Sequence, residues 1–271
     1  MDRSRQQPIG IFDSGIGGLT VAKALHEHMP NEQFIYFGDT YHLPYGDKSA
    51  DAIRYYCIKI SKFLLEKNCK LIIIACNSAS STAYDMLLDF FDGKVLFVNV
   101  VDPLVHEVIS KGYKNIGVIA TKATINSQIY SKKIKSYNPE LTVNEMATPL
   151  LVPMIEEGFY NGNISRNIIE NYLSNPKLEG IDALLLACTH YPLIKNEIND
   201  FYQGKVAILD SIEVVKNEVE QLLTEMDLKS YEKSADDLFY VSDYTTSFES
   251  TTRIFYGEDI KLEAIQIWGQ E

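Results

Sequence analysis

Short apolar runs alternate with longer amphipathic stretches along most of the chain. Short apolar runs are typical of buried strands, and apolar residues at helical spacing indicate helices that cover a sheet. In the first half the predicted strands are Ile9–Phe12, Phe34–Phe37, Leu71–Ala75 and Val95–Val98, and the predicted helices are Gly18–His28, Ser49–Asn68 and Ser78–Phe91. Strands that alternate with helices predict βαβ units and a parallel sheet.

The second half repeats this alternation. Its predicted strands are Ile116–Ala120, Thr142–Ala147, Ala183–Ala187 and Val206–Leu209, and its predicted helices are Thr124–Ser136, Ser165–Leu173 and Tyr191–Phe201. The tail contains one clear amphipathic helix, Ile212–Met226. We expect a strand or two and a shorter helix after it, with the tail returning to the first half of the fold.

The two halves form a weak internal repeat. Ile9–Ser14 resembles Ile116–Thr121, since each segment is an Ile-Gly strand that ends in a hydroxyl residue. A cysteine strand follows at a similar offset, with Cys76 62 positions after Ser14 and Cys188 67 positions after Thr121. The repeat predicts two similar doubly wound α/β domains with mainly parallel sheets, related by a pseudo-twofold axis, with the active site in the cleft between them. We expect the first domain to comprise residues 1–97 and 211–271, and the second to comprise residues 98–210.

Charge and composition narrow the possible functions. The chain carries 25 Lys and Arg against 37 Asp and Glu, a formal net charge of −12, and has no basic cluster, which argues against a nucleic-acid partner. No apolar run is long enough to span a membrane, and the polar amino terminus lacks the core of a signal peptide. The four cysteines include no Cys-x-x-Cys pair, and no His/Asp/Glu spacing indicates a metal site. We therefore expect a cytoplasmic protein with reduced thiols and no metal.

Two of the four cysteines stand out. Cys76 and Cys188 each follow an apolar run and precede a small polar residue, which places them at the carboxyl ends of predicted strands, where α/β sheets bind ligands. A lone cysteine after an apolar run is more often a buried structural thiol, and Cys57 and Cys69 fit that interpretation. The matched positions of the other two suggest a pair of thiols facing one ligand. A helix predicted just beyond each of them is expected to lower its pKa.

The segment from Asp13 to Gly18 (Asp-Ser-Gly-Ile-Gly-Gly) follows the first strand and opens a helix. Its glycines allow a tight turn, and helix N–H groups bind small anions such as a carboxylate. Its spacing differs from the dinucleotide fingerprint, and it lacks the Gly-Lys-Ser/Thr ending of a Walker loop. A plain strand-to-helix turn is the alternative interpretation.

Three further polar segments are candidates for the same cleft. His190, in Thr-His-Tyr-Pro directly after Cys188, is placed to hold a thiol proton, although the segment also fits a helix start. The loop Pro44-Tyr45-Gly46 follows the second strand, and fits either the cleft mouth or a turn with a packed tyrosine. Glu156, in Pro-Met-Ile-Glu-Glu-Gly, is by default a solvated helix charge.

Taken together, these blocks resemble the glutamate racemases of the cofactor-independent aspartate/glutamate racemase superfamily. The resemblance runs from Ile9 to Ser211 and rests on several motifs in the same order: Asp-Ser-Gly-x-Gly-Gly, Gly-Asp-Thr with Pro-Tyr-Gly, Ala-Cys-Asn, Val-Pro with Glu-x-Gly, and Ala-Cys-Thr-His-Tyr-Pro. Two positions depart from the family pattern, since Ser78 replaces a usual threonine and Ala120 a common glycine. Neither change removes a reacting group.

The resemblance implies a set of roles. Cys76 and Cys188 are the expected catalytic thiols, assisted by Asp13 and His190 respectively. The expected substrate-binding residues are Ser14, Pro44, Tyr45, Gly46, Asn77, Ser78, Thr121, Thr189 and Glu156. The implied activity is interconversion of L- and D-glutamate for peptidoglycan synthesis, with no cofactor, glutamate as the small-molecule partner, and a homodimer as a possible assembly.

Three other functions stay open from the sequence. An aspartate or hydantoin racemase would use the same two-thiol chemistry. A non-catalytic two-lobed protein that closes on an amino acid would not need paired cysteines. A thiol-redox protein is the most distant alternative, because two thiols that flank a ligand are not expected to form a disulfide.

Overall fold

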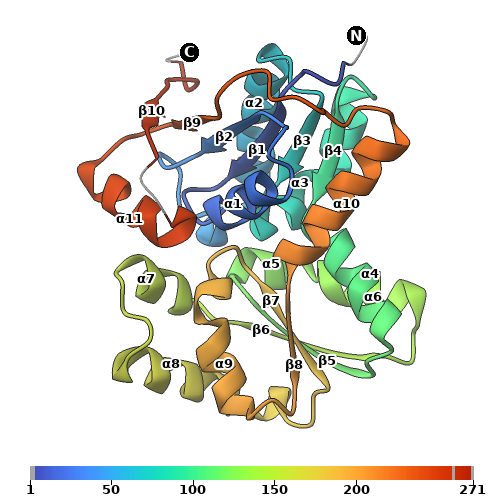
Figure 1. Ribbon diagram of the computed structural model, residues 1–271. Helices are drawn as coiled ribbons and strands as arrows, with labels where there is room; N and C mark the ends of the chain where they lie inside the picture. The colour runs from blue at the N-terminus through green and yellow to red at the C-terminus, as the bar shows by residue number, and fades with distance from the viewer. Residues whose placement is uncertain (1–3, 258–259, 270–271) are drawn as a thin grey trace.

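The computed structural model describes residues 4–257 and 260–269, without the side chains of residues 246, 247, 249 and 250. Within this part of the chain, two parallel β-sheets lie one above the other, each with helices around it (Figure 1). The predicted fold class, two parallel α/β domains, is confirmed. No helix of the described residues is both long and apolar enough to cross a membrane.

The first sheet has the strand order β10-β9-β2-β1-β3-β4, and every pair is parallel. Its strands are β1 (Ile9–Asp13), β2 (Phe34–Gly38), β3 (Leu71–Ile74), β4 (Leu96–Asn99), β9 (Leu238–Val241) and β10 (Leu262–Ala264). Its helices are α1 (Leu19–His28), α2 (Ala50–Glu66), α3 (Asn77–Phe91), α10 (Ser211–Glu225) and α11 (Thr246–Tyr256). Ile73 of β3 faces the core that includes α1 and α10, whereas Ile72 and Ile74 face α2 and α3. Burial on both faces explains why β3 is a continuous apolar run.

The second sheet has the order β6-β5-β7-β8 and is also parallel throughout. Its strands are β5 (Asn115–Ala120), β6 (Thr142–Ala147), β7 (Ala183–Ala187) and β8 (Ala207–Asp210). Its helices are α4 (Asp102–Lys111), α5 (Lys122–Ser127), α6 (Ile129–Tyr137), α7 (Leu151–Glu156), α8 (Asn163–Leu173) and α9 (Lys195–Tyr202). Short 3-10 turns are η1 (Tyr45–Asp47), η2 (Pro176–Leu178) and η3 (Tyr191–Ile194).

The two sheets share one strand order. The first four strands are arranged β2-β1-β3-β4, and their successors in the chain are arranged β6-β5-β7-β8. The strands β3 and β7, which precede Cys76 and Cys188, therefore occupy the same place in their sheets. The tail strand β9 pairs with β2 and so returns to the first sheet. The exact domain limits, 1–97 with 211–271 and 98–210, stay a prediction.

Two local predictions were wrong. The single helix expected over Thr124–Ser136 is two helices, α5 and α6, because Gln128 between them takes a left-handed conformation with φ of 56°. The helix expected to begin at Tyr191 starts as the 3-10 turn η3 and becomes α-helical only at Lys195. Helix α4, whose first turn contains Pro103, was not predicted.

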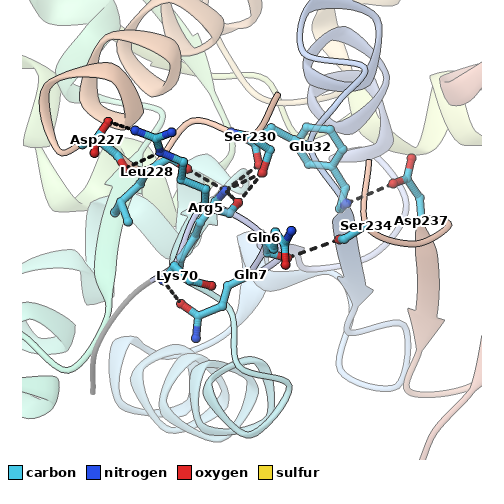
Figure 2. A network of polar contacts seen from close by, with 12 residues as sticks. Arg5, Gln6, Gln7, Glu32, Lys70, Asp227, Leu228, Ser230, Ser234 and Asp237 are labelled. Atoms are coloured by element: carbon cyan, nitrogen blue, oxygen red, sulfur yellow. Dashed lines mark hydrogen bonds and ion pairs between the residues drawn. The ribbon is translucent and has the colours of Figure 1, made fainter. Parts of the chain in front are cut away.

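A buried ion pair and its hydrogen bonds connect the segment after α10 to the first sheet (Figure 2). Lys70, just before β3, places its Nζ 2.6 Å from Glu32 Oε2, and both side chains are almost fully buried. The same ammonium donates to the carbonyl oxygens of Arg5 and Leu228, and Ser230 N donates to the second oxygen of Glu32. The cluster joins the amino-terminal segment, the start of β3 and the segment after α10, and its buried charges are paired and hydrogen-bonded.

Candidate active site

A cavity of about 190 Å³ lies between the two sheets. The residues that line it follow the carboxyl ends of strands in both sheets, where open α/β sheets bind ligands. Pockets for drug-sized molecules measure about 300–1,000 Å³, so this volume suits a smaller molecule such as an amino acid.

Most of the residues that the sequence singled out meet in this cavity. Those that line it are Ser14, Pro44, Tyr45, Gly46, Cys76, Asn77, Ser78, Thr121, Glu156, Cys188, Thr189 and His190. Asp13 lies beneath the lining and is fully buried. The sequence analysis missed several lining residues: Gly15, Leu43, Asp47, Lys122, Thr148, Pro149, Val152 and Pro153. Thr148 was detectable, because it follows β6 as Thr121 follows β5.

Cys76 stands at the start of α3, directly beyond β3. Its Sγ donates toward Ser14 Oγ at 3.6 Å. Burial, together with the negative charge of Asp13, raises the pKa of this thiol to about 12, although the N–H of Ala79 opposes the effect. The expectation that the helix terminus lowers this pKa was therefore wrong, because desolvation outweighs the helix dipole here. At neutral pH Cys76 is a thiol, which suits a proton donor.

Cys188 has a different environment. Its Sγ lies 3.8 Å from His190 Nδ1, and His190 Nε2 lies 2.9 Å from Glu156 Oε1. Burial by itself would lower the pKa of His190, but hydrogen bonds and attraction from Cys188 and Glu156 overcome it and raise the pKa to about 10. At neutral pH both ring nitrogens therefore carry protons, and one of them points at the sulfur. The His190 ring therefore places a positive charge and a proton donor beside the Cys188 sulfur.

Glu156 is thus more than a solvated helix charge. It ends α7, its side chain is 34% exposed, and it accepts from the buried ring of His190. The default interpretation from the sequence was wrong because it considered only the helix, whereas the ion pair joins α7 to the segment after β7. The carboxylate holds His190 in its protonated form and fixes the orientation of the ring.

Asp13 connects the two halves below the cavity. Its carboxylate accepts from Gly15 N at 2.9 Å and from Thr189 Oγ1 at 3.4 Å. Burial raises the pKa of Asp13, while the positive charge of His190 and the hydrogen bonds oppose that rise. The carboxylate acts on Cys76 through its charge.

Gly17 explains why the first turn is rich in glycine. A Cβ at this position would lie 2.3 Å from His190 Cε1 and 2.4 Å from Nδ1. Any side chain at residue 17 must therefore displace the imidazole. The backbone of the first loop approaches His190 so closely that it forms one wall of the candidate site.

Loops from the two sheets also meet at the mouth of the cavity. Ser78 Oγ and Thr121 Oγ1 are 2.8 Å apart, and Lys122 Nζ lies 3.1 Å from Asp47 Oδ1. A Cβ added to Gly46 would lie 2.9 Å from Thr121 Cβ. These contacts link the two sheets' loops beside the cavity, and tighter closure of such a cleft would exclude water from a reaction site.

The Asn77 side chain lines the cavity and has one polar atom without a partner among the described residues. Tyr130 OH donates to Asn77 Oδ1 at 2.6 Å, which assigns the amide nitrogen to the opposite side. That nitrogen, Nδ2, is buried and has no hydrogen-bond partner among the described residues. A buried unpaired donor is unfavourable unless a ligand accepts from it. With the hydroxyls of Ser78 and Thr121 nearby, the site can bind a carboxylate.

Comparison with known proteins agrees with this geometry. Residues 20–219 match the family model of the Asp/Glu/hydantoin racemases. The chain is 40% identical over 255 residues to glutamate racemase 3 of Caldanaerobacter subterraneus, covering 93% of this chain and 92% of the relative. It is 39% identical over 267 residues to a glutamate racemase of Neisseria meningitidis, covering 95% of each.

The fold of this chain is also similar to that of a solved structure. The crystal structure of glutamate racemase from Francisella tularensis in complex with D-glutamate superposes with a TM-score of 0.90 at 36% identity, covering 97% of this chain and 99% of that one. The family resemblance noted in the motifs is confirmed. The chain therefore belongs to the Asp/Glu/hydantoin racemase family and is an amino-acid racemase, an isomerase.

Proposed function

We propose that this racemase interconverts L-glutamate and D-glutamate by passing the α-proton between Cys76 and Cys188. The observation that carries the proposal is that two thiols, at equivalent strand ends of two equally ordered sheets, line one cavity of amino-acid size. Racemisation needs a proton to leave one face of the α-carbon and another to arrive on the opposite face. Two groups on opposite sides achieve this, whereas a single base tends to return the proton to the face it left.

In the proposed reaction, the thiolate of one cysteine takes the α-proton, and the Cα–H bond electrons stay on the substrate as a carbanion. The thiol of the other cysteine then donates its proton to the opposite face and becomes the thiolate. Cys188 removes the proton from L-glutamate, and Cys76 removes it from D-glutamate. Each turnover leaves one thiol and one thiolate, so a turnover in the reverse direction restores the first state. The residues of the closed cleft stabilise the carbanion by fixed donors and by exclusion of water.

A role for Asn77, Ser78 and Thr121 in holding a carboxylate is supported by their place in the cavity lining. The Asn77 amide donor is unpaired among the described residues, and the other two residues contribute hydroxyls that lie 2.8 Å apart. Glutamate is favoured over aspartate because the similar proteins are glutamate racemases. One methylene in a pocket is worth about 10–200-fold in discrimination, so a direct comparison of the two substrates is decisive.

The same proposal includes the physiological role. The D-glutamate made by this enzyme would be used for bacterial peptidoglycan synthesis. We expect the enzyme to act in the cytoplasm and to need no cofactor. Rescue of a bacterial strain that requires D-glutamate tests that role. A homodimer stays a prediction, to be checked by light scattering.

The chemical test is deuterium exchange. The enzyme is incubated with each enantiomer of glutamate and of aspartate in D2O without added cofactor, and deuterium at the α-carbon is followed by NMR. Exchange with glutamate is expected, and Cys76→Ala or Cys188→Ala should abolish racemisation. Cys69→Ala is the control, because this buried thiol lies outside the cavity. Binding of glutamate with no exchange in the wild type would favour a non-catalytic binding protein, and faster turnover of aspartate would change the substrate.

A further inference from the structure

The loop Leu43–Gly46 supplies one wall of the cavity, and its support comes from Asp39. The Asp39 carboxylate is fully buried just after β2. It accepts from Tyr45 OH at 2.6 Å and from His42 Nδ1 at 2.9 Å. One carboxylate thus binds Tyr45, within the loop, and His42, directly before it.

The carboxyl-terminal part of the chain completes this support. Ser242, directly after β9, donates to Asp39 Oδ1 at 2.7 Å, and its hydroxyl accepts from Tyr41 N at 3.0 Å. The backbone N–H of Asp243 donates to Thr40 Oγ1 at 2.9 Å. Ser242 and Asp243, each 203 positions from its partner in the sequence, therefore fix the segment that leads into the loop Leu43–Gly46. We call this loop the substrate loop.

Trp268 covers the other side of the same loop. The His42 ring lies stacked on Tyr56, with centroids 3.9 Å apart, and Trp268 stands edge-on to His42 at 4.4 Å. Trp268 also contacts Tyr56 at 5.5 Å and Tyr55 at 6.4 Å. Its Nε1 is buried without a hydrogen-bond partner among the described residues, so apolar packing against these rings and the neighbouring hydrophobic cluster holds the indole. Trp268 is the single tryptophan of the chain.

We propose that Trp268 is a positioning residue for the substrate loop, acting through His42 and Asp39, so that the carboxyl-terminal segment sets the affinity for substrate. This inference rests on the proposed function. The ring contacts of Trp268 go to residues outside the cavity lining, and its effect passes through the His42 ring to the carboxylate that holds Tyr45. Loosening the loop weakens binding of ground state and transition state alike, which raises KM and leaves kcat nearly unchanged.

The kinetic test compares Trp268→Ala with two matched controls. Trp268→Phe keeps an aromatic ring on His42, and Gln266→Ala changes an exposed residue of the same segment. Aromatic contacts of this kind correspond to about a two- to tenfold change in an equilibrium. We expect Trp268→Ala to raise KM for both enantiomers by about that factor with kcat within about twofold, and both controls to match the wild type. Ser242→Ala, which removes one donor to Asp39, should shift KM in the same direction and serves if Trp268→Ala does not fold.

A spectroscopic test uses Trp268 itself. Racemic glutamate, whose composition the reaction leaves unchanged, is titrated into the wild-type enzyme, and tryptophan emission is recorded. We expect a saturable change with a midpoint close to KM. An unchanged KM in folded Trp268→Ala, an equal rise in Gln266→Ala, or no emission change at saturating glutamate would overturn the inference. A wild type that does not turn over glutamate would instead overturn the proposed function.

Discussion

Replacing Glu156 with glutamine tests whether the carboxylate of this residue keeps His190 protonated. The substitution keeps the shape of the side chain but removes the negative charge 2.9 Å from His190 Nε2. His190 has a pKa raised from 6.5 to about 10, which corresponds to about 5 kcal/mol in favour of the imidazolium. Cys188 and Glu156 share that effect against the opposing cost of burial.

The expected size follows from the contact and its exposure. An opposite charge within about 4–6 Å shifts a pKa by about 1–3. Because Glu156 is 34% exposed, solvent screens it, and the lower half of that range applies. We therefore expect the pKa of His190 to fall by about 1–2 in Glu156→Gln.

The sign of the pH dependence is also fixed. Since folding raises the pKa of His190, its protonation stabilises the folded protein fully below about pH 6.5, and this stabilisation is lost as pH rises toward 10. In Glu156→Gln the loss should begin at lower pH. Turnover of L-glutamate should likewise decline at lower pH than in the wild type, because the proton beside Cys188 is held less strongly.

NMR of isotopically labelled histidine measures the pKa directly, with the His190 signal assigned by its absence in His190→Asn. Glu157→Gln is the matched control, because Glu157 is the exposed neighbour of Glu156. A His190 titration midpoint that is the same in Glu156→Gln and Glu157→Gln would refute the assignment of Glu156 as the group that holds the imidazolium.

Two further substitutions test steric fit and buried charge. Gly17→Ala should displace the His190 imidazole and lower kcat/KM by on the order of 100-fold, while Gly162→Ala, which meets no atom within 4 Å, should match the wild type in the same assay. Lys70→Met leaves a buried carboxylate without its cation and should lower the free energy of unfolding in urea by about 3–5 kcal/mol, whereas the exposed Lys94→Met should change it by less than about 0.5 kcal/mol. Normal activity in Gly17→Ala, or equal midpoints for the two lysine variants, would contradict these expectations.

Much of the fold was predictable because parallel strands that are buried on both faces appear in the sequence as continuous apolar runs. The predicted strands ending at Phe12, Ala75 and Ala187 match three central strands to within one residue at their carboxyl ends. The same property located the site, since polar residues directly after such runs must collect at one edge of the sheet. The two cysteines were found in this way, whereas Ser14 and Thr121 were assigned to the site through the family resemblance.

Some features were missed because the local sequence pattern does not show them. The break at Gln128 requires a left-handed backbone conformation, and no glycine at that position indicates it. The pKa of Cys76 depends on its burial in the assembled cleft and on the charge of Asp13, neither of which is visible in the local helix-start pattern. The ion pair of Glu156 with His190 joins residues 34 positions apart.

The two halves repeat in topology but differ in electrostatics, and that difference has a consequence for the proposed reaction. Cys76 is buried beside an anionic residue, and its raised pKa keeps it as a thiol at neutral pH. Cys188 instead lies beside the His190 ring, whose raised pKa keeps it protonated at neutral pH. In the proposed mechanism Cys76 therefore begins as the proton donor, which leaves removal of the first α-proton to Cys188. In the proposed assignment this state accepts L-glutamate, and D-glutamate must meet the enzyme after the proton has moved from Cys76 to Cys188. A repeated fold thus places two thiols at equivalent strand ends, and in the proposed mechanism their unlike neighbours determine which of them acts first as the base.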